Sequence, residues 1–359
     1  MIEIVELADA LFAQKRRIFT FVKLKPAGAL ITIATRIEMI KRLLFVLICL
    51  YSVLLVFCQS QNNNPPPEQN IAGFQDYVPE VEFRGKIIFQ SDMDGDHEIY
   101  LLTKKGLKKL TDNEWNDENP KWSPDGEKIG FTANPGGKYE IFVMNADGTD
   151  LTQLTTHVRN PIGHTGHNWH PDGKRIAYSI ERRRGIRKSH RMEMVDIHSK
   201  IIEEFAPELK GKTAIPDFSP IEPLVGVTSK GTIGWEVAVY HLQTKELSFL
   251  TEGGKSCRPH FSWDGKKIAF VSAEADGKGD IWLMNPDGSE KTRLTHRDEH
   301  HDYFPAWSPD DMFVVFSSTL SYKKKLKGDW ALFLTKVDDK KTTLLLDTPG
   351  GDLFPDWHK

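Results

Sequence analysis

The chain has 359 residues, 39% of them hydrophobic and 27% charged, with 47 Lys and Arg against 50 Asp and Glu. This composition is ordinary for a folded protein and provides enough apolar residues for a full core. The formal net charge of −3 argues against a general nucleic-acid binder, which needs a basic face. Three cysteines are too few for a disulfide-based scaffold.

The N-terminal part contains a predicted export signal. Lys41 and Arg42 precede the apolar run Leu43–Phe57, and polar residues follow it at once. This order is typical of a secretory signal, whereas a membrane-spanning helix needs about 20 apolar residues. We therefore assign residues 39–57 to a signal peptide and regard a permanent membrane anchor as the alternative. We then expect translation to begin at Met39, so that residues 1–38 are not part of the natural protein. The alternative is that residues 1–38 form a long leader.

Cys58 directly follows the apolar run, where cleavage is expected. The segment resembles the lipobox of bacterial lipoproteins, with Phe57 in place of the usual small residue, and this resemblance implies acylation of Cys58. Residues 58–83 are rich in Pro and Asn and predict a polar tether. Since Cys49 would leave with the signal, Cys257 has no partner for an internal disulfide.

A motif consisting of an aromatic residue followed by Ser-Pro-Asp-Gly, or a variant of it, recurs along the rest of the chain. The intervals between successive aromatic residues are 47, 49, 43, 46 and 50 residues. Each complete unit continues with alternating strands, such as 128–133 and 140–145, and with Asp-Gly turns that predict hairpins. The aromatic residues are Trp122, Trp169, Phe218, Phe261, Trp307 and Trp357.

Units of this size, with four short antiparallel strands each, match the blades of a β-propeller. The first unit begins at its second strand, residues 85–91, and its missing first strand is found at residues 352–357. We therefore predict an all-β fold over residues 84–359. It is a six-bladed β-propeller of four-stranded antiparallel blades, with a closing blade shared by both ends of the domain.

The pattern Trp-Ser-Pro-Asp-Gly, Ile-Ala-Phe, Met-Asn, Asp-Gly and Leu-Thr resembles the six-bladed propeller of TolB over roughly residues 84–359. Related repeats occur in tricorn-type and dipeptidyl-peptidase-type propellers. In TolB an α/β domain precedes the propeller, whereas here we expect a tether in that place. The resemblance implies the fold and no single function, because this propeller serves scaffolds, sugar lyases and peptidase gating domains.

In propellers, the segments before each first strand line the mouth of the central channel. Counting back five residues from each aromatic residue predicts a ring of six positions: Asp117, His164, Thr213, Ser256, Asp302 and Asp352. Aromatic and charged residues in these segments suit a sugar or a peptide anchor. The predicted binding residues are Trp115, Asp117, Arg159, His164, His167, Arg258, His301, Asp302, Tyr303 and Asp352.

Histidines are frequent in and beside these segments. Imidazoles beside carboxylates can bind a divalent metal or move protons, and some propeller lyases are similar in using channel histidines and a metal. The sequence has no HExxH motif and no nucleophile elbow, so we favour solvated loop histidines and predict no cofactor. The alternative metal ligands are His164, His167, His300 and His301.

We predict a lipid-anchored protein of the bacterial cell envelope, in the periplasm or at the outer membrane, that binds or scaffolds through its channel mouth. The expected partner is an envelope protein, or a peptide or sugar ligand, and we expect a monomer that binds no nucleic acid. The alternative is an enzyme, a metal-assisted polysaccharide lyase or hydrolase. A peptidase gating domain is disfavoured because the sequence shows no catalytic domain.

Two basic runs stand apart from the repeat. Residues 181–191 contain five Arg and one Lys and join the second and third strands of one blade, and residues 321–327 occupy the matching hairpin of another. Such runs can contact phosphate or lipopolysaccharide, or they can form a solvated hairpin.

Overall fold

The computed structural model describes residues 83–156, 166–184, 187–211, 213–297, 299–320 and 330–359. The chain divides into two units, Met1–Asn70 and Ile71–Lys359, and all described residues belong to the second. The predicted leader, signal peptide, lipidated Cys58 and almost all of the tether lie outside the described residues. In the described part, no helix has the length and hydrophobicity needed to cross a bilayer.

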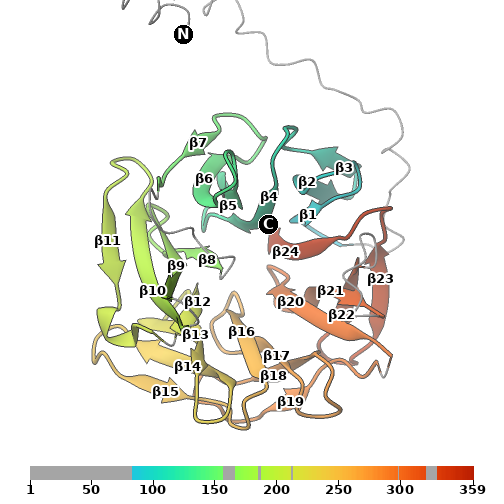
Figure 1. The fold of residues 1–359 in the computed structure, drawn as a ribbon. Helices are drawn as coiled ribbons and strands as arrows, with labels where there is room; N and C mark the ends of the chain where they lie inside the picture. The colour runs from blue at the N-terminus through green and yellow to red at the C-terminus, as the bar shows by residue number, and fades with distance from the viewer. Residues whose placement is uncertain (1–82, 157–165, 185–186, 212, 298, 321–329) are drawn as a thin grey trace, which may run out of the picture. The chain divides into compact units, whose positions relative to one another are not determined.

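The described residues form six four-stranded antiparallel sheets, the blades, around a common centre (Figure 1). This confirms the predicted all-β, six-bladed propeller. Each blade is named here by its order along the chain, and its strands are given from the innermost outward. Blade 1 contains β24 (Leu353–His358), β1 (Lys86–Ser91), β2 (Glu98–Thr103) and β3 (Gly106–Lys109).

Blades 2 to 4 follow in sequence order and are each built from one continuous stretch of chain. Blade 2 contains β4 (Asp117–Trp122), β5 (Lys128–Ala133), β6 (Glu140–Asn145) and β7 (Thr152–Gln153). Blade 3 contains β8 (His167–Trp169), β9 (Arg175–Arg184), β10 (Arg187–Asp196) and β11 (Ile202–Phe205), followed by the 3₁₀ helix η1 (Pro207–Leu209). Blade 4 contains β12 (Thr213–Phe218), β13 (Leu224–Lys230), β14 (Trp235–His241) and β15 (Leu247–Phe249).

The last two blades complete the ring. Blade 5 contains β16 (Ser256–Phe261), β17 (Ile268–Ser272), β18 (Asp280–Met284) and β19 (Thr292–Arg293). Blade 6 contains β20 (His301–Trp307), β21 (Phe313–Thr319), β22 (Ala331–Lys336) and β23 (Thr342–Leu346).

The ring closes in blade 1, where the C-terminal strand β24 pairs with β1. Ile87 pairs with Trp357 in this ladder. The Trp357 indole also donates a hydrogen bond to the carbonyl of Arg84 at 2.7 Å, and its ring packs edge-on against Phe83 at a centroid distance of 5.9 Å. The predicted sharing of the closing blade is therefore confirmed.

The core lies between the blades rather than within any one of them. In β9, Ile176 and Tyr178 pack with Ile141 of blade 2, whereas Ala177 packs with Val227 of blade 4. Successive residues of a strand point to opposite faces of the sheet, so each blade buries one face against each neighbour. A single blade would leave both apolar faces in water, which is why the ring must be complete.

The Ser-Pro-Asp-Gly motif forms the turn between the first and second strands. In blade 2, the Ser123 hydroxyl donates to Asp125 at 2.6 Å and accepts from the N–H of Lys128 at 2.9 Å, while Gly126 has φ 72°. Ser308 and Asp310 make the same contact at 2.6 Å in blade 6. The repeated motif therefore has a structural role in the turn. Candidate binding residues are to be sought on the innermost strands.

Candidate functional site: the central channel

The innermost segment of each blade places one residue in the left-handed region of backbone conformation where it borders the channel. In β4, for example, the pairing with β5 shifts between Glu118 and Lys121, and Asn119 between them has φ 55°. In five of the six blades a proline follows this residue, and proline removes an N–H from an otherwise open strand edge. These six residues, here called the bulge ring, are Asn119, Gly166, Ile215, Arg258, Phe304 and Phe354.

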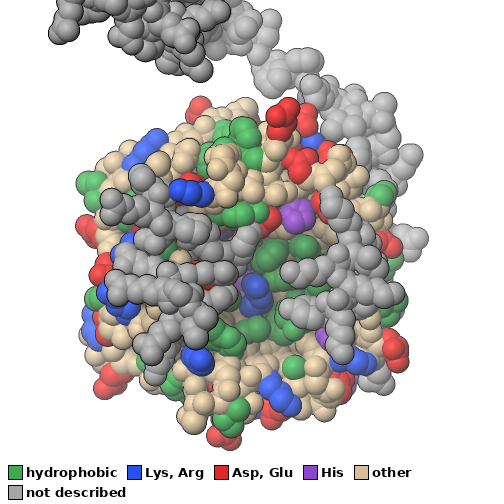
Figure 2. Space-filling view, in the orientation of Figure 1, with side chains coloured by type: hydrophobic (Ala, Val, Ile, Leu, Met, Phe, Trp, Pro, Cys, Tyr) green, Lys and Arg blue, Asp and Glu red, His purple; other side chains and the backbone are tan. Residues whose placement is uncertain are grey.

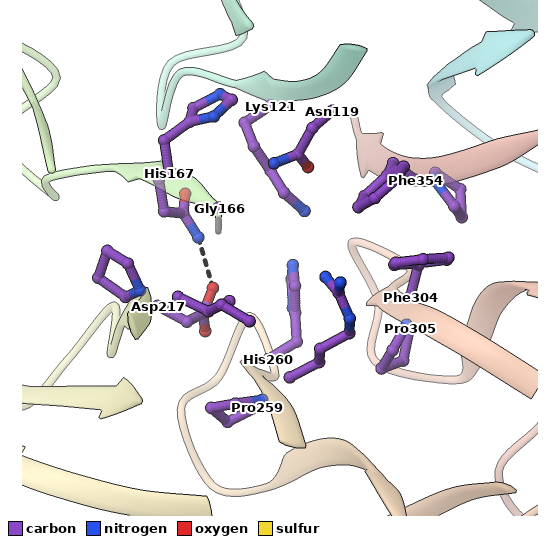
Figure 3. Close-up of a pocket in the computed structure, with 15 residues that line it drawn as sticks. Asn119, Lys121, Gly166, His167, Asp217, Pro259, His260, Phe304, Pro305 and Phe354 are labelled. Atoms are coloured by element: carbon purple, nitrogen blue, oxygen red, sulfur yellow. Dashed lines mark hydrogen bonds between the residues drawn. The ribbon is translucent and has the colours of Figure 1, made fainter. Parts of the chain in front are cut away.

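A second level of side chains lies two residues further along each innermost strand. We call this level the polar ring, because five of its six members are polar. Residues of both rings enclose a cavity of about 50 Å³ at the centre of the propeller (Figure 3). The polar ring consists of Lys121, Asn168, Asp217, His260, Ala306 and Asp356.

Arg258 and two phenylalanines form one cluster of the bulge ring. The rings of Phe304 and Phe354 have a centroid distance of 3.9 Å. The guanidinium carbon of Arg258 lies 4.4 Å from the Phe304 centroid and 5.4 Å from the Phe354 centroid, within cation–π range. Figure 2 shows hydrophobic side chains and a basic group in the central hollow of the molecule. The channel therefore presents a cation held against aromatic faces.

Asp356 is the centre of a charged network in the polar ring. Its carboxylate accepts from Lys121 Nζ at 3.1 Å and from the backbone N–H of Trp122 at 2.8 Å, and His260 Nε2 lies 3.5 Å away. Burial alone would raise the pKa of Asp356, but the charges of Lys121 and His260 and these hydrogen bonds lower it to about 2. The carboxylate is therefore ionised and ties β24 to β4.

Asp217 joins three innermost strands on the other side of the channel. It accepts from the side-chain amide of Asn168 at 2.5 Å, drawn as a dashed line in Figure 3, and from the backbone N–H of Phe261 at 2.7 Å. Burial raises the pKa of Asp217, opposed by the nearby His260. Asp217 and Asp356 each accept a hydrogen bond from a backbone N–H of the innermost strand of the following blade. They therefore provide partners for N–H groups at strand edges that face the channel.

His167 takes the place of the proline in blade 3 and lines the cavity beside Gly166. Its Nε2 donates to the carbonyl of Gly130 at 3.2 Å, and its buried Nδ1 has no hydrogen-bond partner among the described atoms. Burial lowers the pKa of His167 to about 4, so the ring is neutral at pH 7. Its Nδ1 is an acceptor on the channel wall.

The structure places the described members of the predicted mouth ring between strands, where each is at most 2% exposed. Asp117 accepts from Asn113 at 2.7 Å, Asp302 from Ser318 at 2.6 Å, and Asp352 from Thr348 at 2.7 Å. Thr213 and Ser256 bond hydroxyl groups of the adjacent strands, Ser229 at 2.8 Å and Ser272 at 3.1 Å. Burial raises the pKa values of Asp117, Asp302 and Asp352.

Of the ten predicted binding residues, His167 and Arg258 line the central cavity together. Tyr303 lies beside the bulge ring, with its ring 5.9 Å from that of Phe304, and Trp115 packs on the edge of the core cluster of blades 1 and 2. His301 begins β20 and is half-buried. Arg159 and His164 lie outside the described residues.

The alternative metal ligands are not brought together as a described site. His300 accepts from Arg297 Nη2 at 2.8 Å, and burial together with this guanidinium lowers its pKa to about 4. His167 belongs to a different blade, and His164 lies outside the described residues. Among the residues that the structure describes, no group of three or more His, Cys, Asp or Glu side chains could hold a metal ion.

The sequence contains a signal for the channel residues that counting back five positions misses. The bulge-ring residue lies three positions before the aromatic residue of each repeat unit. In five of the six units a proline follows it. This recurring dipeptide would have placed Asn119, Ile215, Phe304 and Phe354 at the channel. The polar ring then follows as the residue directly before each aromatic.

Comparison with known proteins agrees with this architecture. The family model of the TolB β-propeller domain, PD40, matches residues 76–220. Dipeptidyl-peptidase 5 of Porphyromonas gingivalis is 27% identical over 287 residues, covering 65% of this chain and 41% of the relative. An uncharacterised protein of Agrobacterium fabrum is 28% identical over 199 residues, covering 52% of this chain and 60% of that protein. The chain thus spans less than two thirds of either relative.

Solved structures show the same fold. TolB from Acinetobacter baumannii superposes with a TM-score of 0.63 at 18% identity, covering 78% of this chain and 68% of that one. A putative TolB from Agrobacterium tumefaciens gives 0.56 at 18% identity, with 78% and 100% covered. An oligogalacturonate lyase from Vibrio parahaemolyticus gives 0.52 at 14% identity, with 76% and 78% covered. The chain therefore carries a TolB-like six-bladed β-propeller.

Proposed function

We propose that this protein is a ligand-binding module of the bacterial cell envelope, held at a membrane by a lipid on Cys58, and that its channel is the recognition site. The observation that carries the proposal is the cluster of Arg258, Phe304 and Phe354. Arginine and aromatic side chains held rigidly in a concave surface are the residues that dominate binding energies. The cluster is built from three different blades, so it exists only in the closed ring.

The dimensions of the channel restrict what can enter it. A cavity of about 50 Å³ admits a single small group and excludes a sugar oligomer at that depth. The proposed partner is therefore a protein or peptide that inserts one side chain or a chain end and covers the surrounding face. A carboxylate on the inserted group would meet the positive charge of the Arg258 guanidinium.

The binding proposal is tested by purifying the protein from detergent-solubilised envelopes and identifying its partner by mass spectrometry. The affinity of the identified partner is then measured for three forms: wild type, the double variant Arg258→Ala with Phe354→Ala, and Lys266→Ala. Lys266 is exposed in a first-to-second strand turn and serves as the control. We expect the double variant to bind at least about tenfold more weakly, as is typical of hot-spot truncation.

Equal binding of the partner by wild type and double variant would contradict the proposed site. Metal analysis of the same preparation addresses the alternative enzyme. Stoichiometric manganese or zinc that is lost in His301→Ala would favour the metal-assisted polysaccharide lyase or hydrolase.

The proposed anchoring at Cys58 has a separate test. Intact-mass analysis of the membrane-extracted protein should show a mature N-terminus at Cys58 carrying a lipid. Cys58→Ser should lose this lipid mass, because serine has no thiol to acylate. A wild-type protein without lipid at Cys58, or a lipid that persists after the substitution, would contradict the anchor.

A further inference from the structure

A cavity of about 920 Å³ lies on the face of blade 4 that packs against blade 3, its neighbour in the ring (Figure 1). All four strands of blade 4 contribute to its lining, from Thr213 on the innermost strand to Phe249 on the outermost. Leu209 of the 3₁₀ helix η1, which lies between β11 and β12, lines it as well. Sites for small molecules typically have volumes of about 300–1,000 Å³. This space, here called the blade 4 cavity, is therefore large enough for such a ligand.

Blade 4 lacks a pair of aromatic side chains that four of the other five blades have on the same face. In blade 1, Phe89 of the second strand pairs with Tyr100 of the third, their ring centroids are 5.8 Å apart, and both belong to the core cluster shared with blade 6. In blade 4 the directly opposed residues are Val227 and Ala238. The pairs of the remaining blades are Phe131 with Phe142, Tyr178 with Glu193, Phe270 with Trp282, and Phe316 with Phe333.

The smaller pair changes how this side of blade 4 is filled. Protein interiors are close-packed, so the volume of two absent rings must be taken by other groups or remain as a cavity. Val227 and Ala238 are fully buried and belong to the same core cluster as Leu209, so η1 takes part of that volume. The blade 4 cavity lies on the same face, since Leu209 also lines it.

The outermost strand of blade 4 brings an aromatic ring to the edge of this cavity. Phe249 pairs with Ala238 and is 49% exposed, although it lines the cavity. At the same register position, blades 1, 2 and 5 have the polar residues Lys109, Gln153 and Arg293. An exposed ring at the wall of a concave site favours an aromatic ligand, because two rings gain stacking energy beyond the burial of their area.

The charges around the cavity are nearly balanced. The Tyr240 hydroxyl donates to the carboxylate of Glu208. The buried carboxylate of Glu236 accepts from the Thr251 hydroxyl at 2.7 Å and from the backbone N–H of Gly254. The small excess of negative charge gives no attraction for an anionic ligand. The charged lining residues are three glutamates, Glu208, Glu236 and Glu252, and two lysines, Lys210 and Lys230.

We propose that the blade 4 cavity binds an uncharged small molecule with two or more aromatic rings, which takes the place of the ring pair that blade 4 lacks. The rings pack against Phe249 and Leu209. A polar group of the ligand reaches the hydroxyl groups of Thr213 and Ser229, which lie 2.8 Å apart in the lining. The described lining shares no residue with that of the central channel, so this inference does not rest on the proposed function.

The proposal is tested with the full-length protein and N-phenyl-1-naphthylamine, an uncharged dye whose fluorescence rises in apolar sites. Titrations against a protein-free blank compare wild type, Phe249→Lys and the matched control Leu344→Lys. Leu344 holds the same register position in blade 6, opposite Phe333, and is 45% exposed. A further variant, Val227→Phe, restores one ring of the pair, and the melting temperature of each protein is recorded.

We expect wild type to bind one equivalent of the dye saturably, and Phe249→Lys to bind at least about tenfold more weakly, because it removes the aromatic wall. Val227→Phe, where its melting temperature shows that it folds, should also bind more weakly. The control should bind as wild type does, and so should the channel variant Arg258→Ala with Phe354→Ala. The dye 1-anilinonaphthalene-8-sulfonate, which adds only a sulfonate to the same rings, should bind more weakly than the uncharged dye.

Absence of saturable binding to wild type would overturn the inference. So would either folded cavity variant that binds as wild type does, or a loss of binding in Leu344→Lys as large as that in Phe249→Lys. Loss of the dye in the channel variant would place it in the channel instead. Tighter binding of the sulfonate dye would overturn the uncharged class of ligand.

Discussion

Blade 1 and blade 3 teach opposite lessons about the repeat. Blade 1 is assembled from the two ends of the described chain, yet its innermost strand keeps the bulge, the proline, a polar residue in the polar ring and the repeat aromatic, in the segment 354–357. Blade 3 is continuous, yet it replaces the proline by His167 and lengthens its middle hairpin. The regular pattern of the innermost strand therefore does not depend on chain continuity, because the strand that closes the ring keeps it although it comes from the other end of the described chain.

The two blades also carry buried ionisable groups of opposite pH dependence. Asp352, in the segment that enters blade 1, has its pKa raised to about 7 by burial, so the folded state favours the protonated acid. His167 of blade 3 has its pKa lowered to about 4 by burial, so the folded state favours the neutral ring. Asp352 therefore lowers the free energy of unfolding at high pH, and His167 lowers it at low pH.

The largest expected effect comes from breaking the closure of blade 1. Removal of residues 353–359 deletes β24 and leaves the N–H of Trp122 and the ammonium group of Lys121 without Asp356. We expect loss of the cooperative unfolding transition, because the truncation removes a whole innermost strand from a domain whose net stability is only about 5–15 kcal/mol. Urea unfolding followed by circular dichroism measures this, with deletion of Lys359 alone as the control. A cooperative transition in the truncated chain would show that the ring tolerates an open blade.

Asp352→Asn should change the pH dependence that blade 1 contributes. The stabilising contribution of Asp352 is fully present below pH 3.8 and is lost as pH rises through about 7. The difference between the pKa values of 3.8 and about 7 corresponds to about 4 kcal/mol of unfolding free energy. Wild type should lose this stability between pH 4 and 8, and the variant should not. Unfolding free energies at several pH values measure this. Parallel pH profiles for variant and wild type would contradict the assignment.

His167→Gln tests the corresponding group of blade 3. The contribution of neutral His167 is present above pH 6.5 and is lost as pH falls through about 4, a change of about 3 kcal/mol. The variant should be less stable than wild type at pH 7, because it alters a fully buried side chain, but should lose less stability on acidification. The same substitution at the exposed His296 is the matched control. If the unfolding free energy of His167→Gln still fell steeply at acidic pH, a group other than His167 would cause the acid sensitivity.

Gly166→Ala should give the smallest effect. Gly166 has φ 96°, and an added Cβ would lie 3.1 Å from Ile215 Cγ2. We expect a loss of about 1 kcal/mol, because a side chain is strained at this φ and the neighbour must move slightly. The shift of the urea midpoint measures it. Increased stability would show that blade 3 tolerates a side chain at the bulge ring as the other five blades do.

Much of the fold follows from the sequence because the repeat combines two local signals. Strands such as 128–133 alternate in polarity, and Asp-Gly turns provide the positive φ seen at Gly126. The regular intervals then fix the number of blades, and the unpaired strands at the two ends fix how the ring closes. The candidate site was harder to predict, because the depth of a residue in the channel depends on a bulge that shifts the register within each innermost strand.

The sequence by itself determined the blade count and the strand order, since both follow from the short-range periodicity of the repeat. It also determined the closing partner of β1, because the first sheet would otherwise have no innermost strand. Only the tertiary structure decided that Asp117, Asp302 and Asp352 are buried between strands, while Arg258, Phe304 and Phe354 meet at the centre. The physical reason is that six chain segments, separated by more than 40 residues each, converge on one axis. Contacts among them are set by the geometry of closure and not by any local pattern.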